Sequence, residues 1–219
     1  MSFILNIETS SKNCSVCLSS KGKLINSFDS DDNSYRHSEL LTSSIQDILN
    51  KNKMTVKELS AVSVGIGPGS FTGLRIGLSV AKGLCYPHDI PLIGISSLKI
   101  LANPLIEKNK NIISLIKDKG EYYFLSKYDF EFKEIIQPKI QKIDSSFLLN
   151  IIDEQSIITV NTDDAYKFIY ELVKHKVRLV KNTISSKEMI EISQISFNKK
   201  IFEDLAYVEP MYVKKPYVS

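Results

Sequence analysis

The stretch from Gly65 to Gly77 reads GIGPGSFTGLRIG and joins a strand pattern to a helix pattern. The apolar run Ala61 to Ile66 predicts a buried strand, and a helix is predicted from about Thr72 to Tyr86. A glycine-rich loop between such elements can cradle phosphate, because its free amides and the helix dipole favour an anion. It is not a P-loop, since no Gly-Lys-Ser/Thr follows, and no acidic residue closes the next strand as the dinucleotide fingerprint requires.

Three glycines, Gly69, Gly73 and Gly77, recur every four residues and line one face of the predicted helix. Each interior glycine costs a helix about 1 kcal/mol relative to alanine, so we expect another backbone to approach this face closely. A helix–helix contact is the favoured explanation, and a private nucleotide site is the alternative.

Outward from this loop, strands and helices alternate through the first hundred residues. The remaining predicted elements of this half are strands at Phe3–Glu8, Ser15–Ser19, Lys23–Phe28 and Pro91–Ile95, and helices at His37–Asn52 and from Ser96 to about Ala102. A turn at Lys21-Gly22 makes the first three strands an antiparallel meander. Crossover helices then feed strands that lie parallel, so the order predicts a mixed α/β sheet with helices packed against it.

The second half of the chain is rich in lysine, isoleucine and asparagine. Its predicted strands are 112–116, 122–128, 157–160 and 177–180, and its predicted helices are 146–152, 164–175 and 186–201. The tail from Glu209 to Ser219 carries two prolines and is expected to run along the surface. We expect residues 1–103 to form an N-terminal, partner-binding lobe and residues 104–219 a second lobe. The helix at about 186–201 is expected to pack back on the first lobe.

Bulk properties exclude several classes of protein. The 219 residues carry a formal charge of +3. This excess is too small for a nucleic-acid-binding surface that relies on positive charge alone. No apolar run reaches the roughly 20 residues of a membrane span. The N-terminus MSFILNIETSS lacks the features of a signal peptide. We therefore expect a soluble cytoplasmic protein without membrane contact.

The cysteines and histidines offer no visible catalytic or metal set. Cys14 and Cys17 form a C-x-x-C, but they fall in a predicted strand and no second pair completes a zinc site, so packing cysteines are expected. The three histidines, His37, His88 and His175, include no His-x-x-x-His pair. No Ser-His-Asp or Cys-His arrangement is apparent. The sequence predicts neither catalytic residues nor a metal site.

Taken together, the motifs resemble those of the TsaB (YeaZ) family. The segments that carry the resemblance are Ile4–Ser11 with the strand around Cys14, Arg36–Leu41, Gly67–Gly77, Ala81–Leu84, Pro91–Leu98, Asp204–Tyr207, Glu209-Pro210 and Tyr212. The match is near-continuous over residues 3–102 and patchy afterwards. One departure is the segment Ile116-Lys117-Asp118, where family members commonly show Asp-Ala-Arg just before a Glu-x-Tyr.

The resemblance implies an actin-like, Hsp70-like ATPase (ribonuclease H-like) fold with two lobes, the second degenerate. It implies a non-catalytic subunit for the synthesis of tRNA N6-threonylcarbamoyladenosine, which binds the catalytic subunit TsaD and the ATPase TsaE. Alone, such a chain is expected to form a homodimer, and it meets tRNA indirectly, through the complex. It has no cofactor of its own, with ATP or ADP placed at the complex interface. The alternatives are a nucleotide-dependent switch and a glycoprotease-like peptidase.

The resemblance also sharpens two sets of candidate residues. The expected partner interface comprises His37, Ser38, Leu41, Ile45, Leu49, Gly69, Phe71, Thr72, Gly73, Leu74, Arg75, Gly77, Leu78 and Ala81. The residues expected near a nucleotide are Glu8, Thr9, Ser10, Gly67, Pro68 and Ser70. From the glycine stripe we expect Gly73→Leu to abolish TsaD binding while the monomer stays folded.

Overall fold

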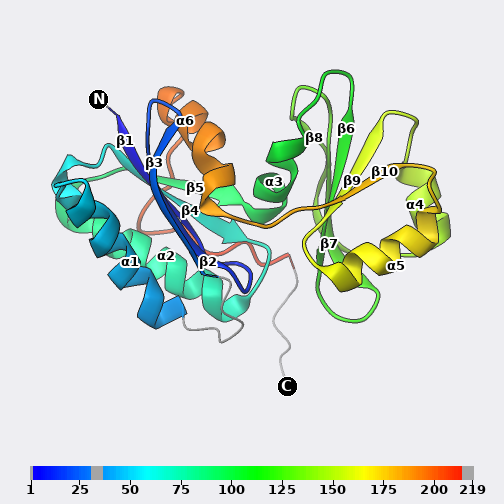
Figure 1. The fold of residues 1–219 in the computed structure, drawn as a ribbon, viewed down its shortest axis with the longest axis horizontal. Coiled ribbons are helices and arrows are strands. Elements are labelled where there is room, and N and C mark those ends of the chain that lie inside the picture. Colours follow the sequence, from blue (N-terminus) through cyan, green and yellow to red (C-terminus); the bar gives the residue numbers. More distant parts are fainter. Residues whose placement is uncertain (1, 31–36, 214–219) are drawn as a thin grey trace. The chain divides into compact units, whose positions relative to one another are not determined.

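The computed structural model describes residues 2–30 and 37–213, which fall into two compact units. Unit 1 combines the first 97 residues with Ile184–Met211. Unit 2 combines Leu98–Thr183 with the segment that begins at Tyr212. Each unit is built on its own five-stranded sheet (Figure 1).

The sheet of unit 1 has the strand order β3-β2-β1-β4-β5. Its strands are β1 (Phe3–Glu8), β2 (Cys14–Ser20), β3 (Lys23–Ser30), β4 (Ala61–Gly67) and β5 (Leu92–Ser96). The first three are antiparallel, and β4 and β5 run parallel to β1. Lys21 and Gly22 both have positive φ, 49° and 74°, as the tight turn between β2 and β3 requires. The predicted mixed sheet with three antiparallel strands first is confirmed.

Helices cover both faces of this sheet. Figure 1 shows α1 (His37–Lys51) and α2 (Phe71–Cys85) on one side of it and α6 (Ile190–Asn198) on the other. The short helix α3 (Ser97–Ala102) follows β5. Apolar side chains from α1, α2 and the sheet form one buried cluster, so the apolar stripes of both helices face the core of unit 1.

A polar cluster binds the segment Ile184–Met211, which rejoins unit 1, to the edge of this sheet. The Asp29 cluster consists of Asn13, Ser15, Asp29, Ser185 and Lys187. The carboxylate of Asp29 accepts hydrogen bonds from the hydroxyls of Ser15 (2.7 Å) and Ser185 (2.8 Å) and pairs with the Lys187 ammonium at 2.8 Å. These charge-assisted bonds hold the 3-10 turn Ser186–Met189 against β2 and β3, and α6 begins directly after it.

The sheet of unit 2 has the order β10-β9-β6-β7-β8. Its elements are β6 (Asn111–Lys117), β7 (Tyr122–Tyr128), β8 (Glu134–Lys142), α4 (Ser145–Ile151), β9 (Ser156–Val160), α5 (Asp163–Val173) and β10 (Arg178–Lys181). Strands β6, β9 and β10 are parallel, while β7 and β8 are antiparallel additions.

Strand β8 and the limits of two helices differ from what the sequence pattern predicts. The missed strand contains Pro138, which lacks a backbone donor and is tolerated here because β8 is an edge strand. Helix α5 ends at Val173 rather than at His175, because Lys174 turns into the left-handed region at φ 42°. The predicted helix 186–201 is a 3-10 turn followed by the shorter α6. Within the described residues, no helix is both long and apolar enough to cross a membrane.

Candidate partner-binding face and strand-end site

The glycine-rich loop links β4 to α2 and is fastened to the loop after β1. Gly67 has φ 105°, a conformation that side chains disfavour. Ser70 is the N-cap of α2, and its hydroxyl accepts a hydrogen bond from the amide of Gly73 at 3.3 Å. The Ser70 amide itself donates to the carbonyl of Ser10 at 2.7 Å. Two of the first amides of α2 and its loop are therefore used within the chain rather than left open to a ligand.

The glycine stripe lies against the chain's own residues Thr9 and Ser10, with Gly73 and Gly77 inside α2 and Gly69 in the loop before it. A Cβ added to Gly69 would come closer than 3.0 Å to Ser10, and one added to Gly73 or Gly77 would come equally close to Thr9. The Thr9 hydroxyl also donates to the carbonyl of Gly73 at 2.8 Å. The sequence correctly predicted a close backbone approach, but the approaching backbone follows β1 and belongs to this chain, not to another helix.

This contact corrects the expectation for Gly73→Leu. The carbonyl oxygen of Thr9 occupies the space that the new side chain needs, and backbone is the least yielding neighbour for such an insertion. The substitution therefore disturbs the fold of unit 1 itself, and a loss of partner binding in that variant would say nothing about an interface.

The apolar members of the predicted interface are buried inside unit 1. Leu41 and Ala81 are fully buried, and the exposed fractions of the others are at most 5%, these being Ile45, Leu49, Leu74 and Leu78. They pack beneath α1 and α2 against the sheet. The expectation that these side chains supply apolar area to a partner is therefore wrong for this conformation, since their area is already buried in the monomer.

Three members of the predicted interface remain exposed on the outer face of α2: Phe71, Thr72 and Arg75. The Phe71 side chain is 49% exposed, although it is large and apolar. The Arg75 guanidinium lies 4.0 Å from the centre of the Phe71 ring, so the two side chains stack as a cation–π pair. We call Phe71, Thr72 and Arg75 the α2 face. The side chains of His37 and Ser38 lie outside the described residues.

The residues predicted near a nucleotide gather at the carboxyl ends of β1 and β4. Glu8 ends β1 and is fully buried, with one carboxylate oxygen accepting from the Ser10 amide at 2.5 Å. Burial raises the pKa of Glu8, and its hydrogen bonds to Ser10 oppose that rise. Its second oxygen, Oε2, has no hydrogen-bond partner among the described residues. The carboxylate lies directly over Gly65, whose missing Cβ leaves the room for it.

This strand-end site is a poor phosphate cradle on its own. The Thr9 hydroxyl is bonded to the carbonyl of Gly73, and the Ser70 hydroxyl caps α2. The hydroxyl that remains for a phosphate is that of Ser10, which lies beside the carboxyl group of Glu8. A buried carboxyl group at this position repels an anion when it is ionised. Gly67 and Pro68 add backbone only, and the carbonyl before them, that of Ile66, accepts from the amide of Met211 at 2.7 Å.

Two of these contacts have no counterpart in the sequence pattern. The pattern places Gly65 in the predicted strand before the loop and gives it no role, whereas in the structure its missing Cβ makes room for a buried acid. The tail that contains Met211 is predicted to run along the surface, yet Met211 bonds to the end of β4. Neighbouring residues of this tail do belong to the motifs of the family resemblance, which is the one available clue.

The cysteines are packed as the sequence predicted. All three are buried thiols, and burial raises the pKa of Cys14 to about 11 and of Cys17 and Cys85 to about 12. Such thiols are inert, because the thiolate is the reactive form. Across residues 2–30 and 37–213, the structure contains no group of three or more histidine, cysteine or acidic side chains placed to hold a metal ion.

Comparison with known proteins identifies the family. A family model described as TsaD, tRNA N6-adenosine threonylcarbamoyltransferase, matches residues 31–219. The tRNA threonylcarbamoyladenosine biosynthesis protein TsaB of Buchnera aphidicola subsp. Acyrthosiphon pisum is 31% identical over 79% of this chain and 90% of its own length. The chain belongs to the TsaB family, within the wider group that the TsaD model describes. The TsaB protein of Haemophilus influenzae is 25% identical over 96% of the chain and 93% of its own length.

Solved structures agree on the TsaB fold. YeaZ from Pseudomonas aeruginosa superposes with a TM-score of 0.81 at 18% identity, covering 97% of this chain and 100% of that one. An inorganic polyphosphate/ATP-glucomannokinase from Arthrobacter is a more distant neighbour, with a TM-score of 0.54 at 10% identity, and covers 91% of this chain and 100% of that one. The predicted α/β fold of the actin-like, Hsp70-like class is confirmed for this TsaB-family chain.

Proposed function

We propose that this chain is a non-catalytic subunit in the synthesis of tRNA N6-threonylcarbamoyladenosine and that it binds TsaD through the α2 face. The role follows the biosynthetic function for which its TsaB relatives are named, and the TsaD-like family model supports a partner of related fold. The single observation that carries the surface is the exposed Phe71–Arg75 pair on a helix whose opposite face is fully packed.

The chemistry of the α2 face suits a binding hot spot. Aromatic and arginine side chains dominate the energetic centres of protein interfaces, because they bury much area at low entropic cost and pair with groups on the partner. Here the arginine is already stacked on the ring, so less side-chain freedom is lost on binding. The helix beneath is fixed by the Thr9–Gly73 hydrogen bond and by its buried apolar stripe. A rigid, partly apolar surface of this kind favours a protein partner.

The test is co-purification of the full chain with TsaD from the same organism, with the double variant Phe71→Ala/Arg75→Ala. The matched control is Tyr207→Ala/Lys57→Ala, which removes an exposed aromatic ring and an exposed cation elsewhere in unit 1. Loss of a hot-spot pair worth about 2 kcal/mol or more weakens binding at least about 30-fold. The control should pair normally, and both variants should melt at the wild-type temperature. Undiminished pairing of the Phe71/Arg75 variant would refute the proposed surface.

The same proposal covers the other partners and the nucleotide. We expect TsaE to join only when TsaD is present, and the isolated chain to self-associate through the α2 face. We expect no ATP binding by the isolated chain, because the strand-end site offers a buried acid where a phosphate would sit. Calorimetry with ATP tests this for the chain alone and for the TsaD pair. ATP binding by the isolated chain would favour the nucleotide-switch alternative, and chelator-sensitive cleavage of a protein substrate would favour the peptidase.

A further inference from the structure

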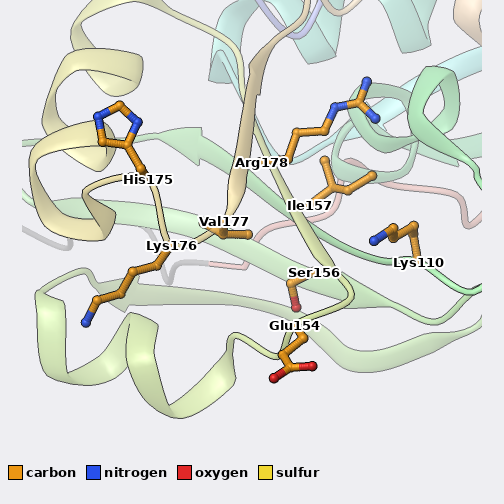
Figure 2. A pocket seen from close by; sticks show the side chains of 8 residues that line it. All are labelled: Lys110, Glu154, Ser156, Ile157, His175, Lys176, Val177 and Arg178. Carbon is orange, nitrogen blue, oxygen red and sulfur yellow. The ribbon is translucent and has the colours of Figure 1, made fainter.

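A pocket of about 370 Å³ lies at the amino-terminal ends of the three parallel strands of unit 2 (Figure 2). Its buried residues are Ser156 and Ile157 at the start of β9, with exposed fractions of 4% and 1%. The residues around it come from the loops before β6, β9 and β10. The volume falls in the usual range of about 300–1,000 Å³ for small-ligand sites. The α2 face and the strand-end site both belong to unit 1, so this pocket has a separate origin in the fold.

The three loops carry an excess of positive charge. Residues 107–110, 153–156 and 174–178 contain five lysines and arginines against three acids. Two of the acids are already paired within the described chain, Glu107 with Arg178 and Asp153 with Lys127. The remaining acid, Glu154, shares the pocket with Lys110 and Lys176. A chain with a net charge of only +3 thus concentrates lysines at one edge of one sheet.

Two of the pocket's basic side chains are held in place before any ligand arrives. The Arg178 guanidinium is fixed by Glu107 at 2.5 Å. The ring of His175 is hydrogen bonded to the hydroxyl of Tyr170 at 2.7 Å, and their rings meet edge to face. In Figure 2, Lys110 and Arg178 lie on one side of Val177, and His175 and Lys176 lie on the other.

The backbone that presents these groups is strained. Lys174 and His175 are consecutive residues with positive φ, 42° and 65°, although neither is glycine. Non-glycine residues in this region are uncommon and cost roughly 1–3 kcal/mol each, and they gather at binding sites. The bend ends α5 and is followed at once by the residues from His175 to Arg178 that line the pocket.

We propose that this pocket binds a phosphate group. Lysine ammonium groups bind phosphate as point charges, and an arginine fork adds directed donors. The carboxylate of Glu154 limits the site to a group of low charge, such as a single phosphodiester, rather than a triphosphate. A phosphate in the backbone of transfer RNA is one source, and in that case the inference rests on the proposed function. A free phosphate ester is the other source and is independent of it.

The experiment uses the full chain with two probes, an unmodified transfer RNA transcript and inorganic phosphate. The variant Lys110→Gln/Lys176→Gln removes two positive charges from the pocket, and the control Lys23→Gln/Lys57→Gln removes two from the surface of unit 1. For an RNA source, the pocket variant should bind the transcript about tenfold more weakly, and its salt slope should fall by about 1, the value for one lost phosphate contact. The control should stay within about twofold of wild type. Thermal melting verifies that both variants fold.

The outcomes distinguish the two sources of phosphate, and they test the phosphate pocket separately from the proposed function. Calorimetric binding of inorganic phosphate that the pocket variant alone loses, with transcript binding unchanged, would support a free phosphate ester. The inference would be overturned if the pocket variant and the control variant bound each probe equally well. It would also be overturned if the wild type bound neither the transcript nor inorganic phosphate. TsaD co-purification of the pocket variant is a separate readout. Failure of TsaD pairing in the wild type would sink the proposed function and leave phosphate binding standing.

Discussion

Alanine substitutions at two glycines of α2 are expected to change the stability of unit 1 in opposite directions. Gly73→Ala places a methyl group closer than 3.0 Å to the carbonyl oxygen of Thr9, whereas Gly83→Ala places the same group in open space, with nothing within 4 Å. The Thr9 carbonyl has little freedom to move, because the neighbouring Ser10 carbonyl is bonded to the Ser70 amide and the Thr9 hydroxyl to Gly73. The two variants therefore differ in tertiary contact but not in helix chemistry.

The magnitudes follow from these contacts. Gly83→Ala should stabilise unit 1 by about 0.5–1 kcal/mol, the helix-propensity gain of alanine over glycine. Gly73→Ala has the same gain, but overpacking costs about 1–3 kcal/mol and loss of the Thr9 hydrogen bond about 1 kcal/mol. The expected net effect at Gly73 is a loss of about 1–3 kcal/mol. For a chain of this length, each kcal/mol corresponds to roughly 2–4 °C in the melting temperature.

Urea unfolding followed by circular dichroism measures both variants against wild type. We expect the midpoint of Gly83→Ala to rise and that of Gly73→Ala to fall, with the slope of the transition unchanged. Equal stability of the two variants would refute the packing of Thr9 against Gly73. A fall in both would instead refute the open space around Gly83.

The remaining predictions concern two carboxyl groups with opposite pKa shifts. Burial works to raise the pKa of Asp29, but the hydrogen bonds of the Asp29 cluster outweigh it and bring the pKa below 3.8, so this stabilisation is present above that pH and is lost as pH falls through the folded value. Urea midpoints of Asp29→Asn should accordingly be lower than wild type at pH 7 and converge with it in acid, and a constant difference across pH would contradict the role of the charge. Burial raises the pKa of Glu8 above 4.5, so wild-type stability should decline as pH rises from 4.5 through the folded value. Glu8→Gln keeps an acceptor for the Ser10 amide and should remove that decline, whereas an unchanged pH profile would show that Glu8 does not titrate in this range.

The local sequence pattern was sufficient to predict most of the fold and part of the candidate site. The meander, the strand before the glycine loop and α2 follow from periodicity and turn residues, because those signals are carried by neighbours in sequence. The glycine spacing also predicted that a backbone approaches α2. The edge strand β8 was missed because Pro138 interrupts a pattern that only its position in the sheet makes tolerable.

The sequence by itself determined that α1 and α2 each carry an apolar stripe, but an apolar stripe has the same pattern whether it faces a core or a partner. Tertiary structure decided the matter by packing Leu41 and Leu78 beneath the helices and leaving Phe71 and Arg75 outside. It likewise chose Thr9 as the neighbour of Gly73 and joined Asp29 to Ser185, 156 residues away. Contacts of this kind depend on how distant segments meet in space, and no local periodicity encodes them.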